Sequence, residues 1–207
     1  MTTEGVTRGG PLRLEAIVLA GGAGTRFGGG KLTALWRDRP LIDGALATAF
    51  AAPVRSITVV TGADAAVGPA AEAFALRLGQ RDRLKLVHAA DHAEGMGATL
   101  RTGVAALPPD AEGVFVFLGD MPLISSDIPR RLAAALAAGV QAVAPRFDGQ
   151  GGHPVLFSAA LFPALRTSTG DEGARAVLQQ LGESLAMIDT DHPGILFDVD
   201  RPDPPAP

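Results

Sequence analysis

Short apolar runs alternate with Ala-rich segments along the first two thirds of the chain. The apolar runs are rich in Val, Ile, Leu and Phe, and their continuous hydrophobicity is typical of parallel strands buried on both faces. These predicted strands are Glu15–Ala20, Ser56–Thr61, Leu84–His88 and Val114–Leu118. The segments with helical spacing are Gly44–Ala52, Asp64–Leu78, Met96–Leu107 and Ser126–Ala138. Strands that alternate with helices predict right-handed βαβ units and a doubly wound sheet.

After Gly139 the pattern is less regular and indicates an antiparallel addition to the sheet. The expected elements are strands at Gln141–Pro145 and Pro154–Phe157, helices at Ala159–Leu165 and Glu172–Leu181, and strands at Leu185–Ile188 and Ile195–Val199. We therefore predict an α/β protein with a Rossmann-like, three-layer α/β/α fold. Its sheet should be mostly parallel, with a small antiparallel addition in the second half.

The chain length favours one domain over residues 14–200. With 207 residues, of which 47% are hydrophobic, the chain can bury one sizeable core but is marginal for two. Residues 1–13 have no periodicity and four glycines and prolines, so we expect a flexible leader. Residues 201–207 are rich in proline and should form a tail that ends the fold.

Composition excludes several classes of function. The net charge is -4 and only 19% of residues are charged, so no basic field favours nucleic acid. The absence of cysteine excludes disulfides, thiolate metal sites and cysteine nucleophiles. No apolar run approaches the roughly 20 residues of a membrane helix, and Glu15 interrupts the apolar segment near the N-terminus. We expect a cytoplasmic protein without membrane or nucleic-acid partners.

The segment from Leu19 to Lys31 directly follows the first predicted strand and is rich in glycine. In an open α/β sheet this position lies at the carboxyl end of the strand, where ligands bind. Glycines let the backbone approach a phosphate and point N–H groups at it. Arg26 and Lys31 add two cations. The sequence therefore predicts a phosphate cradle.

Two common phosphate-binding motifs do not match this loop. A P-loop needs glycine where Thr25 stands, and Ser or Thr where Leu32 stands. A dinucleotide fingerprint needs a third glycine where Phe27 stands, and an acid at the end of the second strand, which closes at Thr61. A dinucleotide-dependent oxidoreductase stays open as a less favoured alternative.

Aspartate residues lie at or just after the ends of two of the predicted strands. Asp120 comes after the fourth strand, on the rim where the glycine loop lies, and Mg²⁺ prefers such oxygen ligands. Asp198 and Asp200 end a predicted strand, where alternation puts both side chains on one face. We predict a metal site that includes Asp120, with helix capping as its alternative role. Asp171 and Glu172 are expected to cap the helix after them.

Several blocks of sequence resemble a known family. Leu19-Ala20-Gly21-Gly22-x-Gly24-x-Arg26-x-Gly28-x-x-Lys31 resembles the signature loop of GT-A-like nucleotidyltransferases. Further blocks are similar to the molybdenum cofactor cytidylyltransferases of the MobA/MocA type: Glu94–Arg101, Leu118–Pro122, Gly152–Phe157, Gly170–Arg175 and Asp198–Asp200. The resemblance runs from about Ala16 to Asp200. A single block of this kind occurs in many proteins, but five blocks in the same order as in the family are specific for it.

The resemblance implies Mg²⁺-dependent transfer of CMP from CTP to a phosphorylated pterin, the molybdenum cofactor, with release of pyrophosphate. Mn²⁺ is the alternative metal. Residues 14–122 would form the nucleotide-binding half and residues 123–200 the acceptor-binding half. A molybdoenzyme apoprotein that receives the product is the implied protein partner. Guanylyl transfer, sugar-phosphate nucleotidyl transfer and a carrier without catalysis stay open as alternatives.

The same resemblance implies roles for individual residues. The nucleotide contacts would be Leu19, Ala20, Gly21, Gly22, Gly24, Thr25, Arg26 and Lys31, with Gly97, Ala98 and Thr99 near the base and ribose. Arg26, Lys31 and Asp120 would be catalytic, and Asp120 and Asp200 would hold the metal, with Asp198 as a neighbour that orients Asp200. His153 and Arg175 would face the acceptor; a structural hydrogen bond and a surface ion pair are their alternative roles. A phosphate monoester is already ionised at neutral pH, so no general base is expected.

Overall fold

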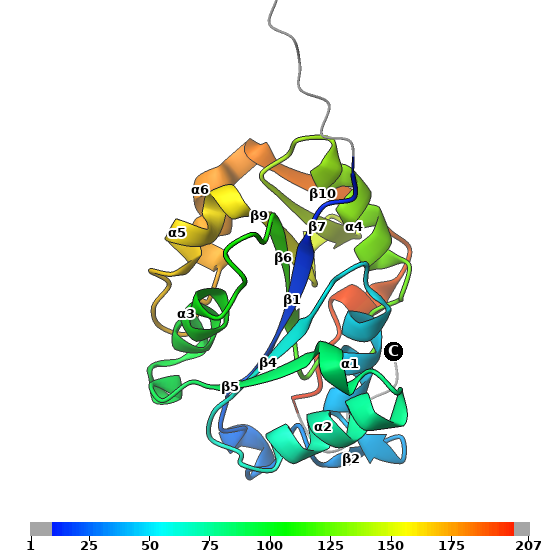
Figure 1. The fold of residues 1–207 in the computed structure, drawn as a ribbon, viewed down its shortest axis with the longest axis vertical. Helices are drawn as coiled ribbons and strands as arrows, with labels where there is room; N and C mark the ends of the chain where they lie inside the picture. Colours follow the sequence, from blue (N-terminus) through cyan, green and yellow to red (C-terminus); the bar gives the residue numbers. More distant parts are fainter. Residues whose placement is uncertain (1–9, 201–207) are drawn as a thin grey trace, which may run out of the picture.

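One twisted, mostly parallel sheet runs through the computed structural model, which describes residues 10–200 (Figure 1). Its strand order is β10-β7-β9-β6-β1-β4-β5. The parallel centre consists of β1 (Leu14–Ala20), β4 (Ile57–Thr61), β5 (Leu84–His88) and β6 (Gly113–Leu118). All four strands predicted for the first two thirds of the chain are confirmed. Because β1 pairs in parallel with β4 and β6, the carboxyl ends of these strands meet at one edge of the sheet.

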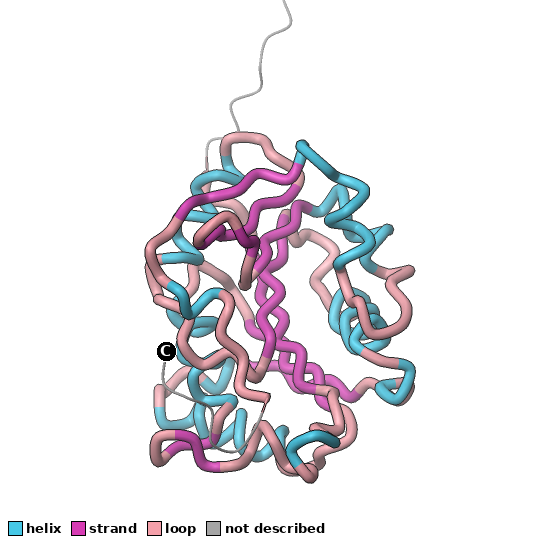
Figure 2. Tube along the Cα trace, turned by 180° about the vertical axis from the view of Figure 1, so that it is seen from behind, coloured by secondary structure: helices cyan, strands magenta, loops and turns pink. Residues whose placement is uncertain are grey.

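The second half of the chain adds strands of both directions. β7 (Ala142–Phe147), β8 (Gln150–Gly151), β9 (Val155–Ser158) and β10 (Leu185–Asp189) extend the sheet beyond β6. β9 lies antiparallel between β6 and β7, β8 pairs antiparallel with β7, and β10 is parallel to β7. From behind, the strands form one twisted band with helices on both sides (Figure 2). The predicted antiparallel addition is confirmed.

Helices cover both faces of the sheet (Figure 1). One face carries α3 (Met96–Ala105), α5 (Phe162–Leu165) and α6 (Arg175–Leu181), and the other carries α1 (Ile42–Ala51), α2 (Val67–Arg77) and α4 (Ile128–Ala137). Short 3-10 turns lie at Thr25–Phe27, Arg81–Arg83, His92–Glu94, Ala159–Leu161, Gly182–Ser184 and Pro193–Ile195. In β1, Ala16 and Val18 belong to one apolar cluster, whereas Ile17 and Leu19 belong to the other. This alternation confirms the three-layer arrangement.

Two local predictions differ from the structure. Residues 195–199 are not a strand: Pro193–Ile195 is a 3-10 turn and the following residues have no regular structure. The apolar pattern arises because Ile195 and Val199 are buried by tertiary packing. The hairpin of β2 (Leu35–Trp36) and β3 (Arg39–Pro40) was not predicted, because its turn places Arg37 and Asp38 at positive φ without the usual Asn or Gly.

The ends of the chain lie partly outside the described residues. Residues 1–9 of the predicted leader and residues 201–207 of the predicted tail are not described. Within the predicted leader, Leu12 packs against the core, and the Arg13 amide donates a hydrogen bond of 3.0 Å to Glu112 Oε2. Across residues 10–200, none of the helices has the length and apolar character that crossing a bilayer requires.

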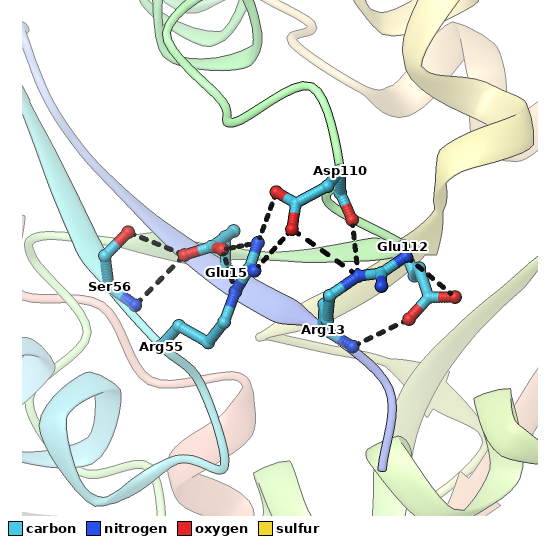
Figure 3. A network of polar contacts seen from close by, with 6 residues as sticks. All are labelled: Arg13, Glu15, Arg55, Ser56, Asp110 and Glu112. Carbon is cyan, nitrogen blue, oxygen red and sulfur yellow. Dashed lines mark hydrogen bonds and ion pairs between the residues drawn. The ribbon is translucent and has the colours of Figure 1, made fainter. Parts of the chain in front are cut away.

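A buried carboxylate joins the starts of the parallel strands (Figure 3). Glu15 is 1% exposed, and its oxygens accept hydrogen bonds from Arg55 Nε at 2.7 Å and from the Ser56 amide and hydroxyl at 3.0 and 2.6 Å. Arg55 also donates to both oxygens of Asp110. These contacts tie together the segments that enter β1, β4 and β6, at the edge opposite the glycine loop.

Candidate active site

A cavity of about 760 Å³ opens at the carboxyl ends of β1 and β6. It lies where parallel α/β sheets bind ligands. Its walls contain most of the residues predicted to bind nucleotide or metal: Leu19, Ala20, Gly21, Gly22, Gly24, Thr25, Lys31, Thr99, Asp120 and Asp200. A smaller hollow of about 240 Å³ shares Gly24, Thr25, Lys31 and Asp200 with it.

The glycine loop folds back on itself so that Lys31 reaches the cavity. Gly24 adopts φ 58°, and its carbonyl accepts hydrogen bonds from the amides of Phe27 and Gly29 at 2.9 and 3.1 Å. A Cβ atom at Gly24 would lie 2.8 Å from Cβ of Lys31. Glycine is therefore required at this position both for the left-handed backbone and for the close approach to Lys31.

Gly21 brings the same loop against the start of α3. A Cβ atom there would lie 2.6 Å from Oγ1 of Thr99. Gly22, by contrast, has open space around the position of a Cβ atom. The contact explains how Thr99, which is 3% exposed, joins the glycine loop in one cavity wall.

Lys31 lies between two of the predicted metal ligands. Its Nζ donates to Asp120 Oδ2 at 2.7 Å and to Asp200 Oδ1 at 3.4 Å, and the lysine side chain is only 14% exposed. The Val199 amide donates a hydrogen bond of 3.1 Å to the Asp120 carbonyl, which holds the late segment against the end of β6. Burial lowers the pKa of Lys31, but hydrogen bonds to Asp120 and Asp200 and their charges outweigh it, so the pKa is raised. The lysine therefore remains charged at neutral pH.

Asp198 also lines the cavity, although residues 195–199 are not a strand. Burial raises the pKa of its carboxyl, and the negative charges of Asp200 and Asp120 raise it further, while Lys31 acts in the opposite direction. Asp198, Asp120 and Asp200 therefore repel one another, and Lys31 offsets part of this repulsion. Close acids of this kind suit a cation.

The carboxylates fit a metal ion that is shared with its ligand. Asp120 and Asp200 supply hard oxygen donors, and both contact the same lysine nitrogen, so they are close enough to share one cation. Within residues 10–200, no group of three His, Asp or Glu side chains could enclose a metal ion. Mg²⁺ binds proteins through one or two carboxylates together with waters and substrate phosphates, so two carboxylates are sufficient.

Four predicted site residues do not line this cavity. Gly97 and Ala98 are buried in α3, and a Cβ atom on Gly97 would lie 2.6 Å from Thr169. Arg175 is exposed at the first residue of α6. The Nδ1 atom of His153 is buried and has no hydrogen-bond partner among the described residues, and burial lowers the pKa of the ring.

Arg26 belongs to the 3-10 turn Thr25–Phe27. Its side chain lies outside the part of the chain that the structure describes. Its proposed contact with phosphate therefore rests on the sequence alone.

Some residues of the cavity wall were not predicted. His92, Ala93, Met96 and Asp171 line it alongside the glycine loop. Asp171 was predicted to cap the following helix, but α6 begins only at Arg175 and has no side-chain cap. The Gly-Asp pair within the block Gly170–Arg175 was the available signal that this loop belongs to the site.

Comparison with protein families identifies the family of the chain. The model of the MobA-like NTP transferase domain matches residues 16–185. Molybdenum cofactor cytidylyltransferase of Escherichia coli K12 is 25% identical over 191 residues, covering 92% of each chain. Nicotine blue oxidoreductase of Paenarthrobacter nicotinovorans is 30% identical over 198 residues, covering 90% of this chain and 92% of the relative.

A solved structure has the same fold. The crystal structure of Rv0371c from Mycobacterium tuberculosis H37Rv superposes with a TM-score of 0.77 at 26% identity. The match covers 93% of this chain and 95% of the mycobacterial one. Together with the family match, it shows that the chain belongs to the MobA-like NTP transferase domain family.

Proposed function

We propose that the chain transfers CMP from CTP to the phosphate of the pterin-based molybdenum cofactor and releases pyrophosphate. One observation carries the proposal: Lys31, Asp120 and Asp200 meet beside the glycine loop in one cavity. A triphosphate needs cations and N–H donors, and a metal needs carboxylates. The acceptor phosphate is itself the nucleophile, so transfer requires positioning and charge neutralisation without a general base.

The glycine loop and its cations would hold the triphosphate. The N–H groups of Gly21, Gly22 and Gly24, with Arg26 and Lys31, would stabilise the charge on the departing pyrophosphate. Thr99 and the backbone at Gly97 and Ala98 would lie near the base and ribose. His153 and Arg175 are proposed acceptor contacts.

Asp120 and Asp200 would hold the divalent cation, with Asp198 beside them. When bound, Mg²⁺ would neutralise the α-phosphate and so reduce its repulsion toward the incoming acceptor. Mn²⁺ is a suitable substitute because it accepts the same oxygen ligands. A structure of Rv0371c that shares this fold (TM-score 0.70, 22% identity) is described as a complex with manganese.

We propose the molybdenum cofactor as the acceptor and cytosine as the base of the nucleotide from the Escherichia coli relative, whose name specifies both the molybdenum cofactor and cytidylyl transfer. A molybdoenzyme apoprotein that receives the product is the protein partner that follows from this proposal. Guanylyl transfer is the nearest alternative, because a few contacts around the base decide between CTP and GTP.

Pyrophosphate release tests the proposal directly. The purified protein would be incubated with Mg²⁺, purified molybdenum cofactor and each of the four ribonucleoside triphosphates in turn. We expect release with CTP that depends on both acceptor and metal. Release with GTP alone would support the guanylyl alternative, and a sugar phosphate in place of the pterin tests the sugar-phosphate alternative. Tight binding of CTP and cofactor without release would indicate a carrier.

A second candidate function comes from the relative that is 30% identical and named an oxidoreductase. A nicotinamide dinucleotide also carries phosphates that a glycine-rich loop can bind. Binding of NADH or NADPH without Mg²⁺, together with no pyrophosphate release from any triphosphate, would favour this function over transfer.

A further inference from the structure

Asp171 contributes a carboxylate to the cavity wall outside the cluster around Lys31. It lies in the loop between α5 and α6, and it lines the cavity together with Gly95, Met96 and His92. A Cβ atom on Gly95 would collide with the Asp171 carboxylate, so the start of α3 and this loop are in direct contact. Any larger residue at position 95 would therefore clash with the Asp171 side chain.

Long-range contacts fix the loop that carries Asp171. The Gly97 amide donates a hydrogen bond of 2.7 Å to the Gly170 carbonyl, and Arg101 Nη1 donates one of 2.9 Å to the Ser168 carbonyl. Arg101 is itself held by Asp91 and Glu94. The loop is thus attached on both sides of Thr169, immediately before Asp171.

Asp171 is exposed, and among the side chains that the structure describes its carboxylate has no ion-pair or hydrogen-bond partner. Four of the other acids near the cavity differ in this respect, since Asp91 and Glu94 pair with Arg101, and Asp120 and Asp200 pair with Lys31. An ionised carboxylate only accepts hydrogen bonds, and it repels phosphate. A ligand group that contacts Asp171 directly is therefore favoured if it presents N–H donors and carries no negative charge.

We propose that Asp171 is a specificity-determining residue that accepts hydrogen bonds from the amino-bearing edge of a substrate heterocycle. This inference rests on the proposed function. Two substrates share the required chemistry, because cytosine or guanine in the donor and the pterin ring in the acceptor each carry an exocyclic amino group beside ring nitrogens. Asp171 would then orient its substrate, since it repels the phosphates that Lys31 and the glycine loop attract.

Calorimetric titration with nucleotides distinguishes the two sources. Asp171→Asn keeps the shape of the side chain but replaces one carboxylate oxygen, a hydrogen-bond acceptor, with an amide N–H₂ group, a hydrogen-bond donor. Wild type and variant would be titrated with Mg²⁺ and CTP, UTP, GTP or ITP, because hypoxanthine lacks the amino group of guanine, and uracil has a carbonyl oxygen in place of the amino group of cytosine. Glu172→Gln is the matched control, since this neighbouring acid is exposed and does not line the cavity.

If Asp171 contacts the base, affinity for CTP or GTP falls by about 10-fold to 100-fold in the variant, and the preference over UTP or ITP is lost. If it contacts the pterin, nucleotide affinity is unchanged and the KM for the acceptor in the pyrophosphate assay rises by about 10-fold or more. Either result supports the inference, provided that Glu172→Gln behaves as wild type.

Changes below about 2-fold in both measurements, in a variant that melts at the wild-type temperature, would overturn the role of Asp171. A wild-type protein that binds no nucleotide would overturn the proposed function, and this inference with it. The two failures are therefore distinguishable in one set of titrations. Asp171→Ala repeats the measurement without the new amide donor.

Discussion

Lys31 Nζ lies 2.7 Å from Asp120 Oδ2, so the cation predicted for the triphosphate contacts an acid predicted for the metal. Asp200 Oδ1 lies 3.4 Å from the same nitrogen. An ammonium group and a divalent cation cannot both occupy the space between these oxygens, because like charges at such distances repel strongly. Binding of metal and triphosphate should therefore be coupled through the movement of Lys31 from the acids to the phosphates.

Lys31→Met should strengthen metal binding in the protein without nucleotide. Removal of the competing charge is expected to raise Mn²⁺ affinity by about 10-fold, whereas CTP affinity in the presence of metal should fall by about 10-fold or more. Electron paramagnetic resonance of free Mn²⁺ measures the first effect and calorimetry measures the second.

Lys85→Met is the control for Lys31→Met, because Lys85 is exposed on β5 and is the other lysine of the chain. It should change neither affinity. Mn²⁺ binding that is unchanged or weaker in Lys31→Met would contradict the coupling.

Gly21→Ala should displace the ligand-free loop, whereas Gly22→Ala should not, because only the first Cβ atom meets another protein atom. A methyl group at Gly21 would lie 2.6 Å from Thr99 Oγ1, and so it must displace either the loop or the start of α3. At Gly22 there is open space, and neither residue has a positive φ. We expect the Kd for CTP to rise by about 10-fold or more in Gly21→Ala and by less in Gly22→Ala. Equal effects of the two substitutions would show that the contact with Thr99 does not position the loop.

Much of this site was predictable because parallel strands leave a strong signal. The strands that end at Ala20 and at Leu118 contain the continuous apolar runs Ala16–Ala20 and Val114–Leu118, and parallel pairing brings the residues after them to one edge. The meeting of Lys31 with Asp120 follows from this topology. Asp200 could be assigned only through the resemblance, because its segment has no regular structure.

Other features could not be predicted because they depend on contacts between distant residues. Ile195 and Val199 mimic a strand pattern since both are buried by the rest of the fold. An acid a few residues before a helix, such as Asp171, is typical of a cap. Its place in the cavity wall depends on the approach of its loop to Gly95 and Gly97, which the order of residues does not reveal.

Acidification should destabilise the fold through His153. Burial lowers the pKa of its ring below the usual 6.5, while the Val116 backbone and Asp120 act in the opposite direction. Between the folded and unfolded pKa values the unfolded chain binds more protons, so stability is full above pH 6.5 and declines as the pH falls toward the folded pKa. Urea unfolding of wild type and His153→Gln at pH 7.5 and pH 5.5 should show that the wild type loses more stability.

His88→Gln is the control for this pH dependence, because His88 is exposed at the end of β5. Its stability should follow that of the wild type at both pH values. Parallel losses in wild type and His153→Gln would argue against a neutral, buried His153.

Glu15→Gln should lower stability without affecting the site. Glu15 accepts hydrogen bonds from Arg55 and Ser56 while it is 1% exposed, so its loss should cost about 2 kcal/mol in the free energy of unfolding. Asp110→Asn removes a more exposed partner of Arg55, whose contact is screened by solvent, and should lower the free energy of unfolding by less than Glu15→Gln does. Denaturant unfolding gives both values. Reduced transfer per folded molecule in Glu15→Gln would refute the separation of the two edges of the sheet.

Pyrophosphate release by Asp120→Asn tests whether the metal and the triphosphate share one site. Release is measured with CTP, Mg²⁺ and purified molybdenum cofactor, beside the wild type and the exposed control Asp82→Asn. We expect release by Asp120→Asn to fall by about 100-fold or more while the protein still melts cooperatively, and Asp82→Asn to retain wild-type release. Near-normal release by Asp120→Asn would contradict the assignment of the metal and the triphosphate to one shared site.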